Sequence, residues 1–129
     1  MSLLAIERGP ADIGWIAPFR RTAAALATEP RQDVARAIAW LEALEATVAA
    51  TLSSRAGGGG DSAAGPVDKL LMTQVDQLLH TMALDVEGVP VDGEALTRYL
   101  WSRAAGIFGG TSEIQRTIVA QRVLGMPRA

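Results

Sequence analysis

The residues best suited to ligand binding form one short segment near the end of the sequence. Gly109 and Gly110 stand directly before Thr111. Glycine adopts backbone conformations that other residues disfavour, and it lets a ligand approach closely. Ser112 and Gln115 have the three-residue spacing of a capping box, which predicts that a helix begins here. Amides at a helix N-terminus bind phosphate or carbonyl oxygens, but glycines before a capped helix are also typical of a tight connection between two helices.

The residue types of this sequence give little support for a metal site or a catalytic nucleophile. The sequence has one histidine, His80, and no cysteine. His80 stands among apolar residues and has no partner at metal-ligand spacing, so we interpret it as a structural histidine. Neither a zinc cluster nor a nucleophile–histidine pair can be assembled from these residues. We therefore predict no metal site.

Length and charge restrict the class of protein. The chain has 129 residues and a formal net charge of −2, which predicts one domain over residues 1–129 and argues against nucleic-acid binding. No stretch reaches the roughly 18 consecutive apolar residues of a membrane helix, and the N-terminus lacks a signal-peptide core. The absence of cysteine agrees with a reducing compartment. We expect a cytoplasmic protein without a membrane span.

Apolar residues at helical spacing predict that most of the chain is helical. The clearest stripes run over residues 34–52 and 67–82, with steps of three and four residues. Lys69 and Asp76 lie off the second stripe. A first segment, about residues 4–27, contains Pro18, which predicts a kink or a restart of the helix.

Shorter elements complete the expected fold. Asp33 is the expected N-cap of the helix that follows it. No segment shows a sustained period-two alternation, so we predict an all-α protein, an antiparallel helical bundle with a shorter last helix. The remaining segments are a flexible glycine-rich connection at 56–65, an irregular stretch at 84–93, a fourth helix at 96–107 that Gly109 and Gly110 end, and a last helix from Ser112 to a stop at Gly125.

Both ends of the chain resemble one enzyme family. Residues 102–128 read SRAAGIFGGTSEIQRTIVAQRVLGMPR, and this stretch resembles the C-terminal signature of the flavin-dependent acyl-CoA dehydrogenases. Residues 4–11 are similar to the helix that opens the C-terminal α-helical domain of the same family. The resemblance covers nearly the whole chain and implies this helical domain, without the N-terminal helical and middle β-domains that family members also carry.

The resemblance implies a reaction that needs a carboxylate base. In this family a carboxylate removes the α-proton of an acyl-CoA thioester while the β-hydride passes to the flavin. Many members carry the base as a glutamate where this chain has Gly109. Other members place it on the first helix of this domain, where Glu7 stands, so the expected base is Glu7, with Arg8 as a neighbouring cation that holds it ionised or contacts the substrate. Two alternatives remain: Glu7 and Arg8 form an ordinary exposed pair, or a partner subunit supplies the base.

The same resemblance assigns cofactor contacts to the glycine-rich turn. It implies that Gly110, Thr111 and Glu113 line FAD and that Gly109 lies beside the substrate. Many members also have a Gln-x-x-Gly-Gly loop that contacts the flavin adenine across the dimer. The corresponding stretch here, residues 84–88, has only one of those glycines, so this second contact is not supported by the motif.

Two functions follow as expectations. The first is the C-terminal domain of an acyl-CoA dehydrogenase, which contributes FAD contacts and part of the acyl pocket, and which forms homo- or hetero-oligomers. Alone, this domain is expected to be inactive, because the other walls of the pocket belong to the domains absent from this sequence. The second is a non-catalytic helical dimerisation or interaction module derived from that domain. An exposed apolar surface fits both functions.

Overall fold

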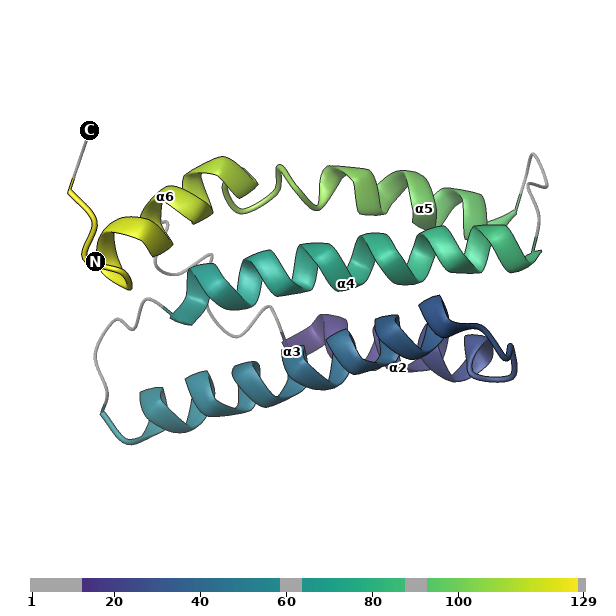
Figure 1. Ribbon diagram of the computed structural model, residues 1–129, viewed down its shortest axis with the longest axis horizontal. Helices are drawn as coiled ribbons and strands as arrows, with labels where there is room; N and C mark the ends of the chain where they lie inside the picture. The colour runs from purple at the N-terminus through teal and green to yellow at the C-terminus, as the bar shows by residue number, and fades with distance from the viewer. Residues whose placement is uncertain (1–12, 59–63, 88–92, 128–129) are drawn as a thin grey trace.

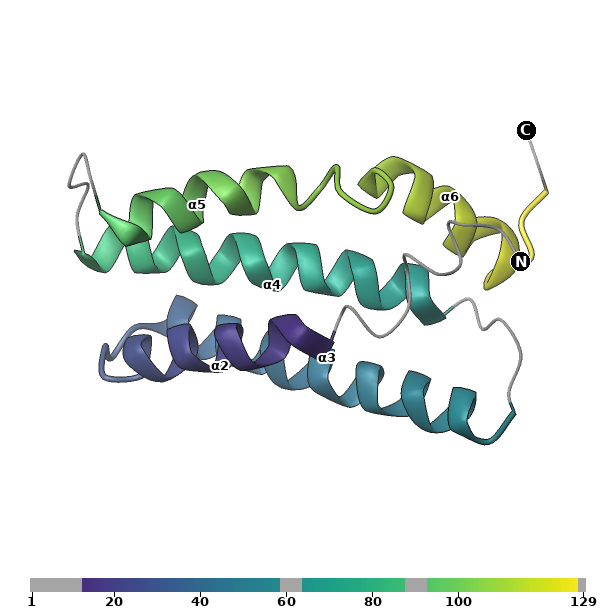
Figure 2. The ribbon, with the colours of Figure 1, turned by 180° about the vertical axis from the view of Figure 1, so that it is seen from behind.

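The computed structural model shows five α-helices and no strand within the residues that it describes, 13–58, 64–87 and 93–127. Figures 1 and 2 show that α2, α3, α4 and α5 run alternately in opposite directions, and that α6 continues in the direction of α5. The predicted all-α antiparallel bundle is therefore confirmed. The helices are α2 (Ile13–Leu26), α3 (Gln32–Ala56), α4 (Ala64–Glu87), α5 (Glu94–Ala104) and α6 (Ser112–Arg122).

Helix α4 is the centre of the bundle. It packs against each of the other four helices, whereas α2 and α3 also pack against each other. The two apolar stripes predicted from spacing form the core that α3 and α4 share with α2, because a stripe of this period places its residues on one side of a helix. The largest fully buried apolar side chains of this core are Phe19, Leu44, Leu79 and Val75. No helix in the described part of the chain is long and apolar enough to cross a membrane.

Helix α2 passes through its proline without a restart. Pro18 lies inside the continuous helix Ile13–Leu26, so the predicted restart is wrong. A proline has no N–H to donate to the carbonyl four residues earlier, which here belongs to Gly14. Gly14 is exposed, so water can serve as the missing donor and the helix continues. The rest of the first predicted segment, residues 4–12, lies outside the described residues.

The N-cap position of α3 differs from the one expected. The N-cap position is Arg31, and it makes no side-chain cap hydrogen bond. Asp33 lies inside the first turn, where its Oδ1 accepts the N–H of Val34 at 3.0 Å and the Nε of Arg31 at 3.0 Å. The hydrogen bond from Arg31 lowers the pKa of the Asp33 carboxyl. The prediction of Asp33 as the N-cap is wrong, although its charge does favour a helix N-terminus.

Two helix ends also differ from expectation. Helix α4 continues through Glu87, so the stretch from residue 84 begins in helix and is not irregular throughout. Helix α5 ends at Ala104, before Ile107, which is 65% exposed and not part of the helix. The early end of α5 is explained by hydrogen bonds from donors outside this helix. The carbonyls of Ala105 and Gly106 accept from α4 and from Ser112, in place of donors from a continuing helix.

An ion pair between α2 and α3 gives a testable pH dependence. Arg20 Nη2 donates to Glu45 Oε2 at 2.6 Å, and Arg20 Nε contacts Oε1. The Arg20 hydrogen bonds lower the pKa of Glu45 below its ordinary value of 4.5. A lowered pKa stabilises the fold above the unfolded-state pKa, and this contribution is lost as the pH falls through the folded-state pKa. Because Arg20 is exposed, we expect Glu45→Gln to cost at most about 1 kcal/mol at pH 7.

The measurement is urea unfolding of both proteins at pH 7 and at a low pH that lies below the pKa of the carboxyl in both the folded and the unfolded state. The difference in midpoint between wild type and Glu45→Gln should disappear at the lower pH. A difference that persists unchanged at low pH would contradict an electrostatic role for the pair.

Candidate functional site

The residues predicted to bind cofactor lie together in the connection from α5 to α6. Gly109, Gly110 and Thr111 form the end of this connection, and Glu113 lies in the first turn of α6. The predicted base, Glu7, and its neighbour Arg8 lie outside the described residues. Their roles therefore stay predictions from the sequence.

The two glycines have backbone conformations that favour glycine. Gly109 has φ of +65° and Gly110 has φ of +99°. A side chain at Gly109 has room, since a Cβ there would meet only the Cε of Lys69, at 3.7 Å. The backbone conformation, not the space, therefore requires glycine at this turn.

The helix cap is Thr111, not Ser112. Thr111 has φ of −62° and ψ of 154°, and its hydroxyl accepts the N–H of Ile114 at 3.4 Å. Ser112 is the first helical residue, and its N–H donates to the carbonyl of Gly106 at 3.0 Å. The predicted capping box of Ser112 and Gln115 is therefore wrong, although the predicted start of the helix is correct to within a residue.

Gln115 holds the turn by a hydrogen bond from inside the bundle. Its side chain is fully buried, and its Nε2 donates to the carbonyl of Gly109 at 3.0 Å. Its Oε1 has no hydrogen-bond partner within the described residues. The side chain thus reaches back across the turn and holds the Gly109 peptide, a role different from the capping role that its spacing indicates.

Helix α4 holds the other side of the turn. Lys69 Nζ donates to the carbonyl of Ala105 at 2.6 Å, and Thr73 Oγ1 donates to the same carbonyl at 3.2 Å. Both side chains are buried. Lys69 lies off the apolar stripe, which is the pattern of an exposed residue. No signal in the sequence could therefore have predicted its contact with Ala105. A lysine stem can be buried along apolar surface when its ammonium group has a partner, and here the ammonium group donates to the backbone.

The turn presents backbone donors at a helix N-terminus. Within the described residues, the amide N–H groups of Gly110 and Thr111 have no acceptor, and both residues are partly exposed. Hydrogen bonds from its own backbone N–H and from the Thr111 side chain lower the pKa of the Glu113 carboxyl, so Glu113 is ionised at neutral pH. The arrangement can donate two hydrogen bonds to oxygen or nitrogen atoms of a ligand. These donors fit FAD, whose ring, ribityl chain and phosphates all carry acceptors.

The single histidine belongs to a different part of the bundle. His80 is buried on α4, and its Nδ1 lies 2.7 Å from Oδ1 of Asp76. Within the described residues, no group of three or more histidine, aspartate or glutamate side chains is placed to hold a metal ion.

The cap gives a prediction that separates Thr111 from its neighbour. Thr111→Ala removes the acceptor for the Ile114 amide and should cost about 1 kcal/mol of unfolding free energy. Ser112→Ala is the matched control, because the Ser112 hydroxyl makes only a 3.5 Å contact with Gly106 while its backbone N–H is unaffected. Denaturant unfolding of both variants makes the comparison. An equal loss in both would contradict the assignment of Thr111 as the cap.

Comparisons with known proteins agree with this description of the turn and the helices. Residues 17–124 match the family model described as acyl-CoA dehydrogenase, C-terminal domain. The chain is 36% identical over 148 residues to the acyl-CoA dehydrogenase IpdE1 of Mycobacterium tuberculosis, an alignment that covers 99% of this chain and 37% of the relative. It is 32% identical over 146 residues to the acyl-CoA dehydrogenase IpdE1 of Mycolicibacterium smegmatis, covering 99% of this chain and 36% of that protein.

The chain therefore spans little more than a third of the length of these two relatives. No solved structure matches it. The family model nonetheless covers most of the chain, including α3, α4, α5 and the whole glycine-rich turn. The chain belongs to the acyl-CoA dehydrogenase C-terminal domain family.

Proposed function

We propose that this chain acts as the C-terminal domain of an FAD-dependent acyl-CoA dehydrogenase and that its α5–α6 turn contacts the flavin. The observation that carries the proposal is the pair of amides at Gly110 and Thr111, which stand without acceptors at the N-terminus of α6. In this role the two amides and Glu113 bind the cofactor, and Gly109 lies beside the acyl substrate. FAD, when bound, supplies the acceptor for the β-hydride of the thioester.

The base in this proposal is Glu7. Gly109 has no side chain, so the turn itself cannot remove the α-proton of the substrate. Glu7 takes that proton, and the positive charge of Arg8 favours its ionised form or binds the substrate. Support for this assignment comes from the sequence context alone. The prediction is that Glu7→Gln abolishes acyl-CoA dehydrogenation by the assembled flavoenzyme while flavin binding is retained.

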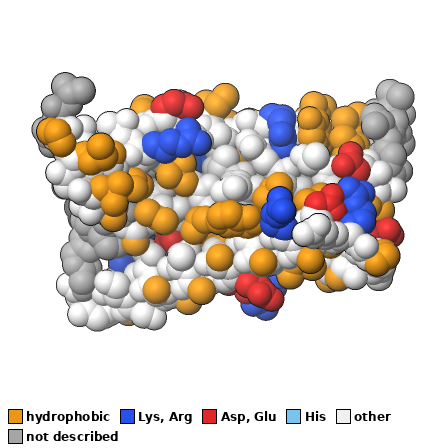
Figure 3. Space-filling model, in the orientation of Figure 1, with side chains coloured by type: hydrophobic (Ala, Val, Ile, Leu, Met, Phe, Trp, Pro, Cys, Tyr) orange, Lys and Arg blue, Asp and Glu red, His pale blue; other side chains and the backbone are white. Residues whose placement is uncertain are grey.

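An exposed apolar edge supports oligomerisation through this domain. Figure 3 shows hydrophobic side chains at the surface over α5 and α6. The exposed apolar residues of this edge are Leu100, Trp101, Ile107, Phe108, Ile114, Val123 and Leu124. Surfaces of this kind mark contacts with other proteins or domains. We propose that this edge is covered by the remaining domains or by other subunits of the enzyme.

The same edge also favours the second candidate function, a non-catalytic helical interaction module. The lack of a carboxylate at Gly109 agrees with it too. The two functions differ in one property: an interaction module associates with itself or with a partner but has no use for the free amides of Gly110 and Thr111.

Flavin titration of the ¹⁵N-labelled chain tests the proposal. We expect FAD to shift the amide signals of Gly110 and Thr111 saturably, with a Kd of about 0.1–1 mM, because only part of the site is present. Gly58 is the internal control, since it is also a glycine of positive φ but lies at the end of α3. Absence of any saturable shift at Gly110 and Thr111, in a chain that remains helical, would reject the flavin contact and favour the interaction module.

A further inference from the structure

A second candidate site lies between α2, α4 and α5, where α4 approaches its end and α5 begins. The cavity there has a volume of about 360 Å³, which is within the range of small-molecule sites. Its walls carry both charged and apolar side chains. The residues that line it are Arg21, Thr22, Ala25, Leu26, His80, Ala83, Val86, Glu94, Ala95 and Arg98.

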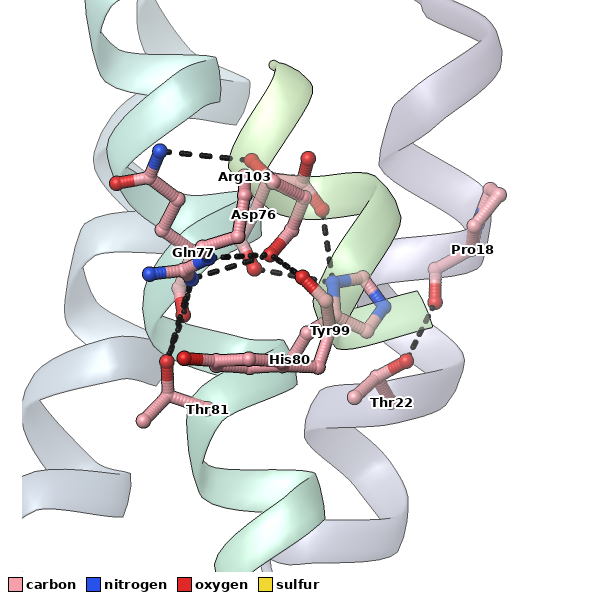
Figure 4. A network of polar contacts seen from close by, with 9 residues as sticks. Pro18, Thr22, Asp76, Gln77, His80, Thr81, Tyr99 and Arg103 are labelled. Carbon is pink, nitrogen blue, oxygen red and sulfur yellow. Dashed lines mark hydrogen bonds and ion pairs between the residues drawn. The ribbon is translucent and has the colours of Figure 1, made fainter. Parts of the chain in front are cut away.

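The buried wall of the cavity presents hydrogen-bond acceptors. His80 is only 8% exposed, and its Nδ1 lies 2.7 Å from Oδ1 and 3.0 Å from the backbone carbonyl of Asp76. Because both contacts are acceptors, Nδ1 carries the proton of the neutral ring, and Nε2 is left as an acceptor. Figure 4 shows this second nitrogen pointing away from Asp76 toward α2, the helix of Thr22. Nε2 has no partner within the described residues.

Thr22 adds a second acceptor to the same wall. Its hydroxyl donates to the carbonyl of Pro18 at 3.3 Å, and its residue is 8% exposed. With its proton used in this way, the Thr22 oxygen offers lone pairs to a ligand. A ligand group that meets this wall must therefore bring a hydrogen-bond donor.

The rim of the cavity carries two arginines and one glutamate. Arg21 on α2 has no ion-pair partner within the described residues, and it lines the cavity together with Arg98 on α5. Arg98 pairs with Glu94, but both of these side chains are largely exposed, at 46% and 77%, so that pair contributes little and can rearrange. Guanidinium groups prefer carboxylates, which they bind through two parallel hydrogen bonds.

We propose that this cavity binds a small hydroxycarboxylic acid. Its carboxylate pairs with Arg21 and Arg98 at the rim, and its hydroxyl donates to Nε2 of His80 with Thr22 as the neighbouring acceptor. A plain fatty acid would leave the buried acceptors without a donor. The cavity thus recognises both the carboxylate and the hydroxyl group of the ligand.

The single histidine makes the test specific, because the imidazole nitrogens of His80 give one unique pair of ¹⁵N signals. The probes are 3-hydroxybutyrate and butyrate, titrated into the 129-residue chain. We expect 3-hydroxybutyrate to shift the Nε2 signal saturably with a Kd of about 1–10 mM, and to bind at least about fivefold more tightly than butyrate. Arg21→Gln should weaken binding about tenfold.

Arg36→Gln is the matched control, since Arg36 is an exposed arginine on α3 that does not line the cavity. It should leave the affinity unchanged, and amide spectra of both variants verify the fold. Three results would each overturn the proposal: no saturable shift up to about 100 mM, equal binding of 3-hydroxybutyrate and butyrate, or equal affinity in Arg21→Gln and wild type.

Discussion

Leu79→Ala is expected to lower the free energy of unfolding by about 3 kcal/mol, the largest effect of any single truncation that we consider. Leu79 is completely buried on α4, the helix that packs against all four others. Removing its side-chain methyls loses their burial free energy and leaves a cavity that the surrounding helices fill only in part. The measurement is urea unfolding followed by helical circular dichroism.

Leu100→Ala provides the matched control for this truncation. Leu100 is also a helical leucine, but it is 59% exposed on α5. Its loss should cost no more than about 0.5 kcal/mol, since surface substitutions away from specific contacts have small effects. Similar losses in the two variants would contradict the position of Leu79 at the centre of the core.

Gln115→Ala is expected to cost about 2–3 kcal/mol, because it removes a buried hydrogen bond and also leaves a cavity. Gln115 is the buried tie between α6 and the carbonyl of Gly109. Its loss should also let the turn move, so the amide signals of Gly109 and Gly110 should shift or broaden while those of α3 stay in place. Chemical denaturation and ¹⁵N amide spectra measure the two effects.

One further variant separates the two causes of that loss of stability, and a second provides a control. Gln115→Met keeps the volume and removes only the hydrogen bond, so its cost should be about 1 kcal/mol. Gln74→Ala truncates a glutamine exposed on α4 and should change stability by less than about 0.5 kcal/mol. If Gln115→Ala proved as mild as Gln74→Ala, or left the glycine signals unchanged, Gln115 would not be the tie that holds the turn.

The core could be predicted from the sequence because a helical apolar stripe reports directly on which side of a helix is buried. Leu41 and Leu44 on α3, and Val75 and Leu79 on α4, occur at the expected spacing and are all buried. A spacing of three or four residues needs no knowledge of the partner helix, since any partner will cover the same face. The all-α fold follows from the same local information.

The details of the site could not be predicted in this way, because they depend on contacts between helices. Ser112 and Thr111 are both good caps, and the sequence does not decide between them, whereas in the structure the Thr111 hydroxyl accepts the Ile114 amide. Lys69 has the pattern of an exposed residue, and only the position of Ala105 opposite α4 explains its burial. The sequence identified the glycine-rich turn as the candidate site. The residue that caps α6 and the hydrogen bonds that hold the turn could be identified only from the structure.

A pair of substitutions at Thr111 tests whether the backbone amides of the α5–α6 turn bind the flavin. Thr111 has φ of −62°, which matches the angle that a proline ring fixes. Thr111→Pro and Thr111→Ala both lose the hydroxyl cap, but only the proline variant loses the amide N–H, which has no acceptor within the described residues.

The measurement is FAD affinity of these two variants, with circular dichroism to verify that each remains helical. We expect Thr111→Pro to bind FAD about tenfold more weakly than Thr111→Ala, the effect of one hydrogen bond to a charged or strongly polar acceptor. Equal affinities in two folded variants would contradict the claim that this amide contacts the flavin.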